Sequence, residues 1–165
     1  MCVDVRSNIG VIFQDFKILA TSIAENVLMR PITDKVTDEL TVINALKHVG
    51  LYNKVRNLPN GIYTKLTKEY DVNGAIFSGG EFQKLAISRL YARKCNIIIL
   101  DEPSSSLDPL AENDIFNSVL NLVKDKTVIL ISHRLTNIKN VDKIVVMENG
   151  EYAEMYNIQA EKYLV

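Results

Sequence analysis

Residues 97–103 read IIILDEP, an unbroken aliphatic run that ends in two adjacent carboxylates and a proline. Strands that are apolar on both faces are typical of a parallel sheet covered by helices. Similar runs occur at Thr127–Ile131 and Lys143–Met147, and a proline opens a helical stretch at about 109–123. This alternation predicts an α/β fold with a mostly parallel sheet to which all three runs contribute.

The stretch before this run has helical rather than strand periodicity. Ser22 and Glu25 have the spacing of a capping box at the start of a short helix. Residues 35–49 carry apolar side chains at helical spacing, and a glycine follows them, as is common where a helix ends. Further helices are predicted at Leu51–Asn57 and from Gly80 onward. These patterns predict a mainly helical segment between the first and second strands.

The composition is that of an ordinary folded protein. The 165 residues suffice for one compact domain, and 47% are hydrophobic and 24% charged. Nineteen basic and twenty acidic residues give a net charge of −1, which argues against a nucleic-acid-binding surface. Cys2 and Cys95 lack metal-site spacing, so plain buried thiols are expected. The sequence shows no signal peptide and no apolar run of the roughly 20 residues that span a bilayer.

Asp101 and Glu102 are the strongest candidates for chemistry. Ligand sites in open α/β sheets lie at the carboxyl ends of the strands, where this pair stands. One carboxylate there can hold Mg²⁺ while its neighbour polarises an attacking water. The alternative for this pair alone is a strand that simply ends in a polar turn.

A second candidate is the segment Phe77-Ser78-Gly79-Gly80-Glu81, which directly precedes a predicted helix. Two glycines let backbone N–H groups approach a ligand closely, and a helix N-terminus carries partial positive charge. The combination suits an anion such as phosphate. The alternative is an ordinary loop with a helix cap.

Two further polar residues also follow strands. His133 comes just after the run 128–131, where an imidazole can reach a phosphate or an attacking water. Gln14 follows the apolar run 9–13. Taken singly, His133 is more typical of a hydrogen-bonded surface histidine, and Gln14 carries no signal.

In this order, these motifs resemble the linear signature of ABC-type ATPases, and the resemblance covers about residues 6–150. It implies a P-loop NTPase-like fold with a helical subdomain. By this resemblance the Q-loop glutamine is Gln14, the signature loop is Phe77–Glu81, Walker B is Ile97–Glu102, the D-loop is Ser105, Ser106, Leu107 and Asp108, and the switch histidine is His133.

The resemblance implies ATP and Mg²⁺ as cofactors and a role for each residue. Asp101 would bind Mg²⁺ through water, and Gln14 would also reach the metal and sense a transmembrane partner. Glu102 would be the general base on the hydrolytic water. His133 would contact the γ-phosphate.

The signature loop would act across a dimer interface. Ser78, Gly79, Gly80 and Glu81 would close over ATP held by a second nucleotide-binding domain in a head-to-tail pair, and Asp108 would help couple the two sites. The commonest spelling of this motif has leucine at Phe77 and glutamine at Glu81. The serine and both glycines are kept, so contact with nucleotide is still expected.

Two stretches resemble exporters rather than importers: Arg6–Asn26, which contains Ser-Ile-x-Glu-Asn, and Thr67–Gly74. This implies an exporter's transmembrane domain, fused or separate, as partner and a peripheral location on the cytoplasmic face of the membrane. The expected organisation is a partial ATPase domain over 1–150, with the helical subdomain at about 22–95 and the Walker B, D-loop and histidine part at 96–150. The remaining stretch, 151–165, resembles the family's C-terminal helix.

The family's glycine-rich Walker A loop does not occur in this sequence. Only thirteen residues precede Gln14, and none form a Gly-x-x-x-x-Gly-Lys pattern. We therefore expect that the N-terminal portion of the fold is missing, as in a fragment, a mis-started reading frame or a degenerate protein. The 165-residue chain alone would then have reduced stability and lack the cradle for the β- and γ-phosphates, which puts its own ATPase activity in doubt.

Two other functions are compatible with the motifs. A truncated, non-catalytic module could lend only its signature loop to a complete partner. A DNA-maintenance ATPase head shares the signature and Walker B motifs, but such proteins insert long coiled coils between the Q-loop and the signature. The interval from Gln14 to Ser78 shows no sustained heptads, and the net charge of −1 also argues against DNA.

Overall fold

The structure is a computed structural model and divides into two compact units, Met1–Ile131 and Ser132–Val165. Each unit is described by itself. The residues that the structure describes are 5–66, 74–103, 119, 126–132 and 141–157.

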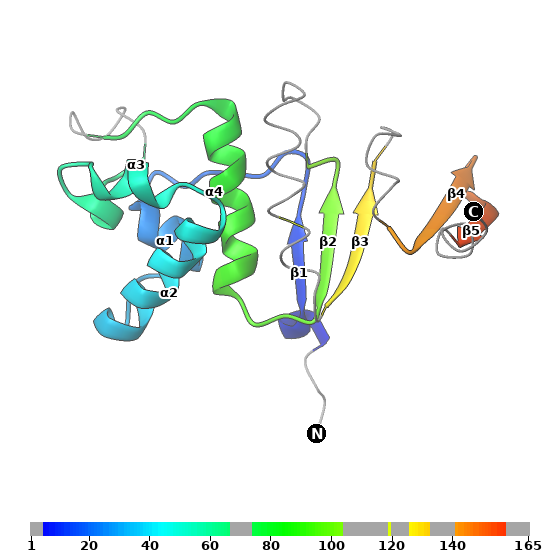
Figure 1. The fold of residues 1–165 in the computed structure, drawn as a ribbon, viewed down its shortest axis with the longest axis horizontal. Helices are drawn as coiled ribbons and strands as arrows, with labels where there is room; N and C mark the ends of the chain where they lie inside the picture. Colours follow the sequence, from blue (N-terminus) through cyan, green and yellow to red (C-terminus); the bar gives the residue numbers. More distant parts are fainter. Residues whose placement is uncertain (1–4, 67–73, 104–118, 120–125, 133–140, 158–165) are drawn as a thin grey trace, which may run out of the picture. The chain divides into compact units, whose positions relative to one another are not determined.

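The first unit contains a three-stranded parallel sheet, as predicted (Figure 1). Its strands are β1 (Ile9–Ile12), β2 (Ile97–Asp101) and β3 (Thr127–Ile131), in the order β1-β2-β3. The register pairs Ile12 with Leu100 and Asp101 with Ile131. The carboxyl ends of the three strands therefore lie at one edge of the sheet. A short 3₁₀ helix, η1 (Val5–Asn8), leads into β1.

The described residues of the first unit also form four α-helices. They are α1 (Ile23–Leu28), α2 (Lys35–His48), α3 (Tyr52–Arg56) and α4 (Gly79–Ala92), with the 3₁₀ helix η2 (Gly61–Tyr63) between the last two. The predicted capping box begins α1: the Glu25 N–H donates to Ser22 Oγ (3.2 Å), and the Ser22 N–H donates to Glu25 Oε2 (3.1 Å). In the part of the chain that the structure describes, no helix is both long and apolar enough to span a bilayer. The helix predicted at 109–123 lies almost wholly outside that part.

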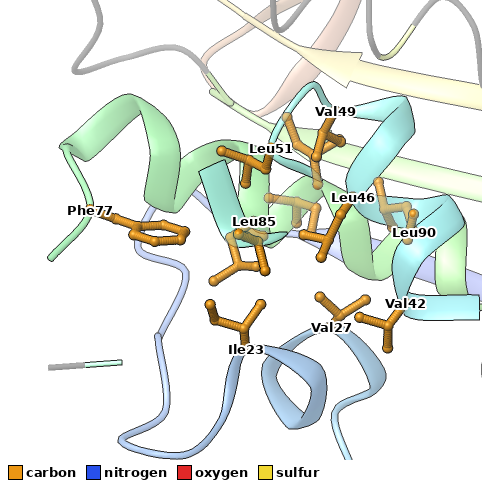
Figure 2. Packing of buried hydrophobic residues seen from close by; sticks show 14 of the residues in the cluster. Ile23, Val27, Val42, Leu46, Val49, Leu51, Phe77, Leu85 and Leu90 are labelled. Carbon is orange, nitrogen blue, oxygen red and sulfur yellow. The ribbon is translucent and has the colours of Figure 1, made fainter. Parts of the chain in front are cut away.

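A hydrophobic core joins the helices to one another (Figure 2). Ile23 of α1, Leu46 of α2 and Leu85 of α4 point into it and are fully buried. Each of these side chains contributes about 1.5–3 kcal/mol of transfer free energy. The other helices therefore fix the position of α4, and Phe77, just before α4, packs into the same core.

Gly10 allows α4 to lie directly against β1. A Cβ atom at this position would lie 2.8 Å from Leu90 Cδ2 and 2.9 Å from Cys95 Sγ, so no larger residue fits without displacing them. Cys95 itself is a buried free thiol, as predicted. This close approach connects the helical part to the sheet that carries the candidate carboxylates.

The second unit contains an antiparallel hairpin of β4 (Lys143–Glu148) and β5 (Glu151–Asn157). Asn149 and Gly150 have positive φ angles of 52° and 81°, as a tight two-residue hairpin turn requires. The prediction of a helix from residue 151 is therefore wrong over Glu151–Asn157, and 158–165 lie outside the described residues. Lys143–Met147 pairs with β5 in this hairpin, and the place predicted for it in the parallel sheet stays a prediction. A boundary after residue 150 would cut the hairpin, whereas the two units divide after Ile131.

Candidate functional site

The carboxyl edge of the parallel sheet gathers three of the predicted site residues. Asp101 is the last residue of β2 and Glu102 follows it, while Gln14 follows β1 by two residues. Because Ile12 is level with Leu100, the chain leaves β1 at the same edge where β2 ends. Both carboxylates are partly exposed and Gln14 is exposed, so a ligand can approach this edge.

Glu102 is held in an unusual backbone conformation. Its N–H donates to the carbonyl of Ile131 on β3 (3.0 Å), and its φ angle is +43°. A non-glycine residue with positive φ is uncommon, and such residues concentrate at functional sites. The hydrogen bond and the strained φ together fix the direction in which the Glu102 side chain leaves the sheet.

Because of its positive φ angle, position 102 should accept glycine at a lower cost in stability than alanine. Replacing Glu102 by glycine should leave the protein roughly 0.5–1 kcal/mol more stable than replacing it by alanine. The left-handed conformation costs a side-chain-bearing residue about 1–2 kcal/mol, which exceeds the extra backbone entropy of glycine, about 0.5–1 kcal/mol. Urea unfolding of the two variants measures the difference. A glycine variant no more stable than the alanine variant would contradict a left-handed backbone at this position.

Phe77–Glu81, the predicted signature loop, contains the N-cap of α4, Ser78, and part of its first turn. The Glu81 N–H donates to Ser78 Oγ (3.3 Å), and the Ser78 N–H donates to Glu81 Oε2 (2.7 Å), which makes a second capping box. Phe77 is buried and packs near Phe82, with ring centroids 5.7 Å apart. Ser78 is exposed, and a Cβ atom built on Gly79 would meet nothing within 4 Å. The loop is thus anchored at Phe77, with Ser78 exposed and open space at Gly79.

Glu81 is also paired with a lysine that the sequence analysis did not single out. Lys54 Nζ of α3 lies 2.6 Å from Glu81 Oε2 and 4.7 Å from the centroid of the Phe77 ring. Partial burial alone would raise the pKa of Glu81, but the hydrogen bonds from Lys54 and Ser78 outweigh it, so the pKa is lowered. The Glu81 carboxylate is therefore ionised, and it accepts hydrogen bonds from Lys54 of α3 and from Ser78, the N-cap of α4.

A buried asparagine ties the segment after Gln14 to α4. Asn26 Oδ1 accepts the N–H of Leu19, and Asn26 Nδ2 donates to the carbonyl of Leu19 (both 2.9 Å). From α4, Arg89 Nε donates to the carbonyl of Asn26 (3.0 Å), and Arg89 Nη2 donates to the carbonyl of Lys17 (2.8 Å). The exporter-like Ser-Ile-x-Glu-Asn stretch includes Asn26, but the motif does not predict these hydrogen bonds.

Several predicted site residues lie outside the described part of the chain. These are Ser105, Ser106, Leu107, Asp108 and His133. In the sequence, His133 follows the end of β3 by two residues. Within the described residues, no cluster of three or more His, Cys, Asp or Glu side chains could hold a metal ion without other ligands.

A parallel α/β sheet with carboxylates at its carboxyl edge, together with a serine-glycine segment that begins a helix, is typical of the class of nucleotide-binding α/β proteins. The family model described as "ABC transporter" matches residues 1–105. The chain belongs to the ABC transporter family. The fold and family expected from the sequence are therefore confirmed.

Exporters and a transport ATP-binding protein are among the similar proteins. A "putative multidrug export ATP-binding/permease protein" of Staphylococcus aureus is 37% identical over 150 residues, which are 90% of this chain and 25% of that protein. The "nisin transport ATP-binding protein NisT" of Lactococcus lactis is 36% identical over 150 residues, 91% of this chain and 25% of that protein. A solved structure, "a bacterial Atm1-family ABC exporter with ATP bound", superposes with a TM-score of 0.75 at 28% identity, over 94% of this chain and 26% of that one. The chain thus spans about a quarter of the length of these relatives.

Proposed function

We propose that this chain is part of the ATP-hydrolysing domain of an ABC exporter, which couples ATP hydrolysis to export of a substrate across a membrane. The observation that carries this proposal is the convergence of Gln14, Asp101 and Glu102 on one edge of the sheet. The homology to exporters supports the direction of transport. The domain would act on the cytoplasmic face of the membrane, where it would dock on the exporter's transmembrane domain.

The residues at the sheet edge fit Mg²⁺ with a nucleotide. Mg²⁺ prefers oxygen ligands and is usually bound by one or two protein groups together with waters and substrate phosphates. Asp101 and Gln14 supply a carboxylate and an amide oxygen, and the described residues hold no larger cluster that would suit a metal alone. Bound Mg²⁺ would neutralise charge that develops on the phosphates.

Glu102 would accept the proton of the water that attacks the γ-phosphate. Its fixed backbone suits this role, because a general base has to lie within hydrogen-bond reach of the proton that it takes. His133, just past the end of β3, would contact the γ-phosphate. The Gln14 segment would report the state of this site to the transmembrane domain.

The signature loop would complete the site of a second domain. The N-terminus of α4, a fourteen-residue helix, carries a partial positive charge that favours phosphate. The residues at this end are Ser78, Gly79, Gly80 and Glu81. The exposure of Ser78 and the open space at Gly79 leave room for a nucleotide bound elsewhere. Two such domains would pair head to tail, and the D-loop residues Ser105, Ser106, Leu107 and Asp108 would lie between their sites.

Gly79→Ala tests this proposal with little risk to the fold. The added methyl group meets nothing within 4 Å, so the melting temperature should stay within about 2 °C of the unmodified protein. ATP turnover by the intact protein should nevertheless fall by about tenfold or more, because the methyl group would occupy the space of a partner's nucleotide. Phosphate release from Mg-ATP, with and without EDTA, measures this. An unmodified protein that hydrolyses no ATP, or a fully active variant, would refute the proposal.

A further inference from the structure

Lys54 is the one cation that the described structure shows in an ion pair with the signature loop. It comes from α3, 27 residues before Glu81, and its Nζ lies 2.6 Å from Glu81 Oε2. The same ammonium group lies 3.4 Å from the carbonyl of Ile76 and over the ring of Phe77. Three contacts therefore hold its charge beside this loop, and its side chain is 39% exposed.

The signature loop carries a carboxylate, Glu81, at the place proposed for phosphate, so a positive counter-charge is needed there. A carboxylate at the start of a helix is favourable for the helix, but it also occupies the positive end that would attract a phosphate. Glu81 Oε2 accepts the N–H of Ser78, so the carboxylate lies beside the very residue that would meet the nucleotide. Without a counter-charge, a phosphate arriving at Ser78 would meet a like charge.

We propose that Lys54 is a positioning residue that neutralises Glu81, so that a signature loop carrying glutamate accepts the phosphates of a partner-bound nucleotide. This inference rests on the proposed function of the loop. Lys54 does not touch the nucleotide. It acts through Glu81, to which it is joined by the ion pair.

A double-mutant cycle in the intact protein tests the inference. Lys54→Met removes the charge but keeps an unbranched apolar side chain that can still pack on Phe77. We expect Lys54→Met to lower kcat/KM for Mg-ATP by about tenfold, the effect of one uncompensated charge near a phosphate in a partly wet site. In a Glu81→Gln background, where no charge needs compensation, the same replacement should cost less than about twofold. Lys54→Arg should retain activity, because it keeps the charge.

Arg56→Met is the matched control, since it removes another exposed cation from α3. It should leave kcat/KM unchanged. If Lys54 acted only through its contacts with the Ile76 carbonyl and the Phe77 ring, Lys54→Met would lower kcat/KM equally with glutamate or glutamine at position 81, and that result would overturn the inference. Full activity of Lys54→Met would overturn it as well. An unmodified protein that neither hydrolyses Mg-ATP nor is stabilised by it would refute the proposed function and the inference together.

Discussion

Replacing Glu102 by glutamine should lower ATP turnover by about 10²–10⁴-fold, the usual contribution of a positioned general base. Glutamine has nearly the same shape as glutamate but cannot accept the proton of the attacking water. Because the carboxylate leaves the sheet just beyond Asp101, its loss removes the base without removing the proposed metal ligand. The variant should therefore still bind Mg-ATP and hold it without turnover, which a filter-binding assay and a phosphate-release assay measure together.

Asp15→Asn is a suitable control for this experiment. Asp15 is an exposed carboxylate next to Gln14 whose ion pair with Lys17, at 3.4 Å, is also exposed. Exposed pairs of this kind contribute little to stability. The control should change turnover less than twofold. If Glu102→Gln also had little effect, the chain would be better explained as a non-catalytic module that lends its signature loop to a complete partner.

The parts of the fold that could be predicted from the sequence are those set by local periodicity. An aliphatic run such as 97–100 is compatible with few structures other than a buried strand, and the Ser22–Glu25 spacing fixes where α1 begins. The common edge at which these strands end could be predicted as well, because the carboxyl ends of neighbouring parallel strands lie on the same side of a sheet. The positions of Gln14, Asp101 and Glu102 at one edge are therefore a consequence of strand direction and register.

The C-terminal hairpin shows where family resemblance misled the prediction. Asn149-Gly150 is a strong signal for a two-residue hairpin turn, and the following residues are rich in tyrosine, which favours strands. The resemblance to a C-terminal helix outweighed this local signal. The turn places Glu148 opposite Glu151, and β5 then continues beside β4.

Other features could not be read from the sequence, because they depend on tertiary packing. The Lys54–Glu81 pair joins two helices across 27 residues, and no periodicity links these positions. The role of Asn26 depends on the direction of its side chain into the protein, which the motif alone does not give. Its neighbours in the hydrogen-bond network, Leu19 and Arg89, come from a loop and from a helix 63 residues away.

Replacing Asn26 by leucine should lower the free energy of unfolding by about 3 kcal/mol. Leucine is close to asparagine in shape, so the packing of α1 is largely kept, but both hydrogen bonds to Leu19 are lost. A buried polar group left without a partner costs about 1–3 kcal/mol. Leu19 is 41% exposed, so water can compensate part of the loss there. Urea unfolding of the intact protein measures the change.

The comparison with an exposed asparagine separates the hydrogen bonds from the effect of leucine itself. Asn53→Leu makes the same chemical change on the exposed surface of α3 and should shift stability by less than about 0.5 kcal/mol. Arg89→Met should lower the free energy of unfolding by less than Asn26→Leu does, because the hydrogen bonds between Asn26 and Leu19 remain. If Asn26→Leu cost no more than Asn53→Leu, the connection between the Gln14 segment and α4 would have to depend on apolar packing. A large loss would instead show that this polar network stabilises the connection between the segment after Gln14 and helix α4.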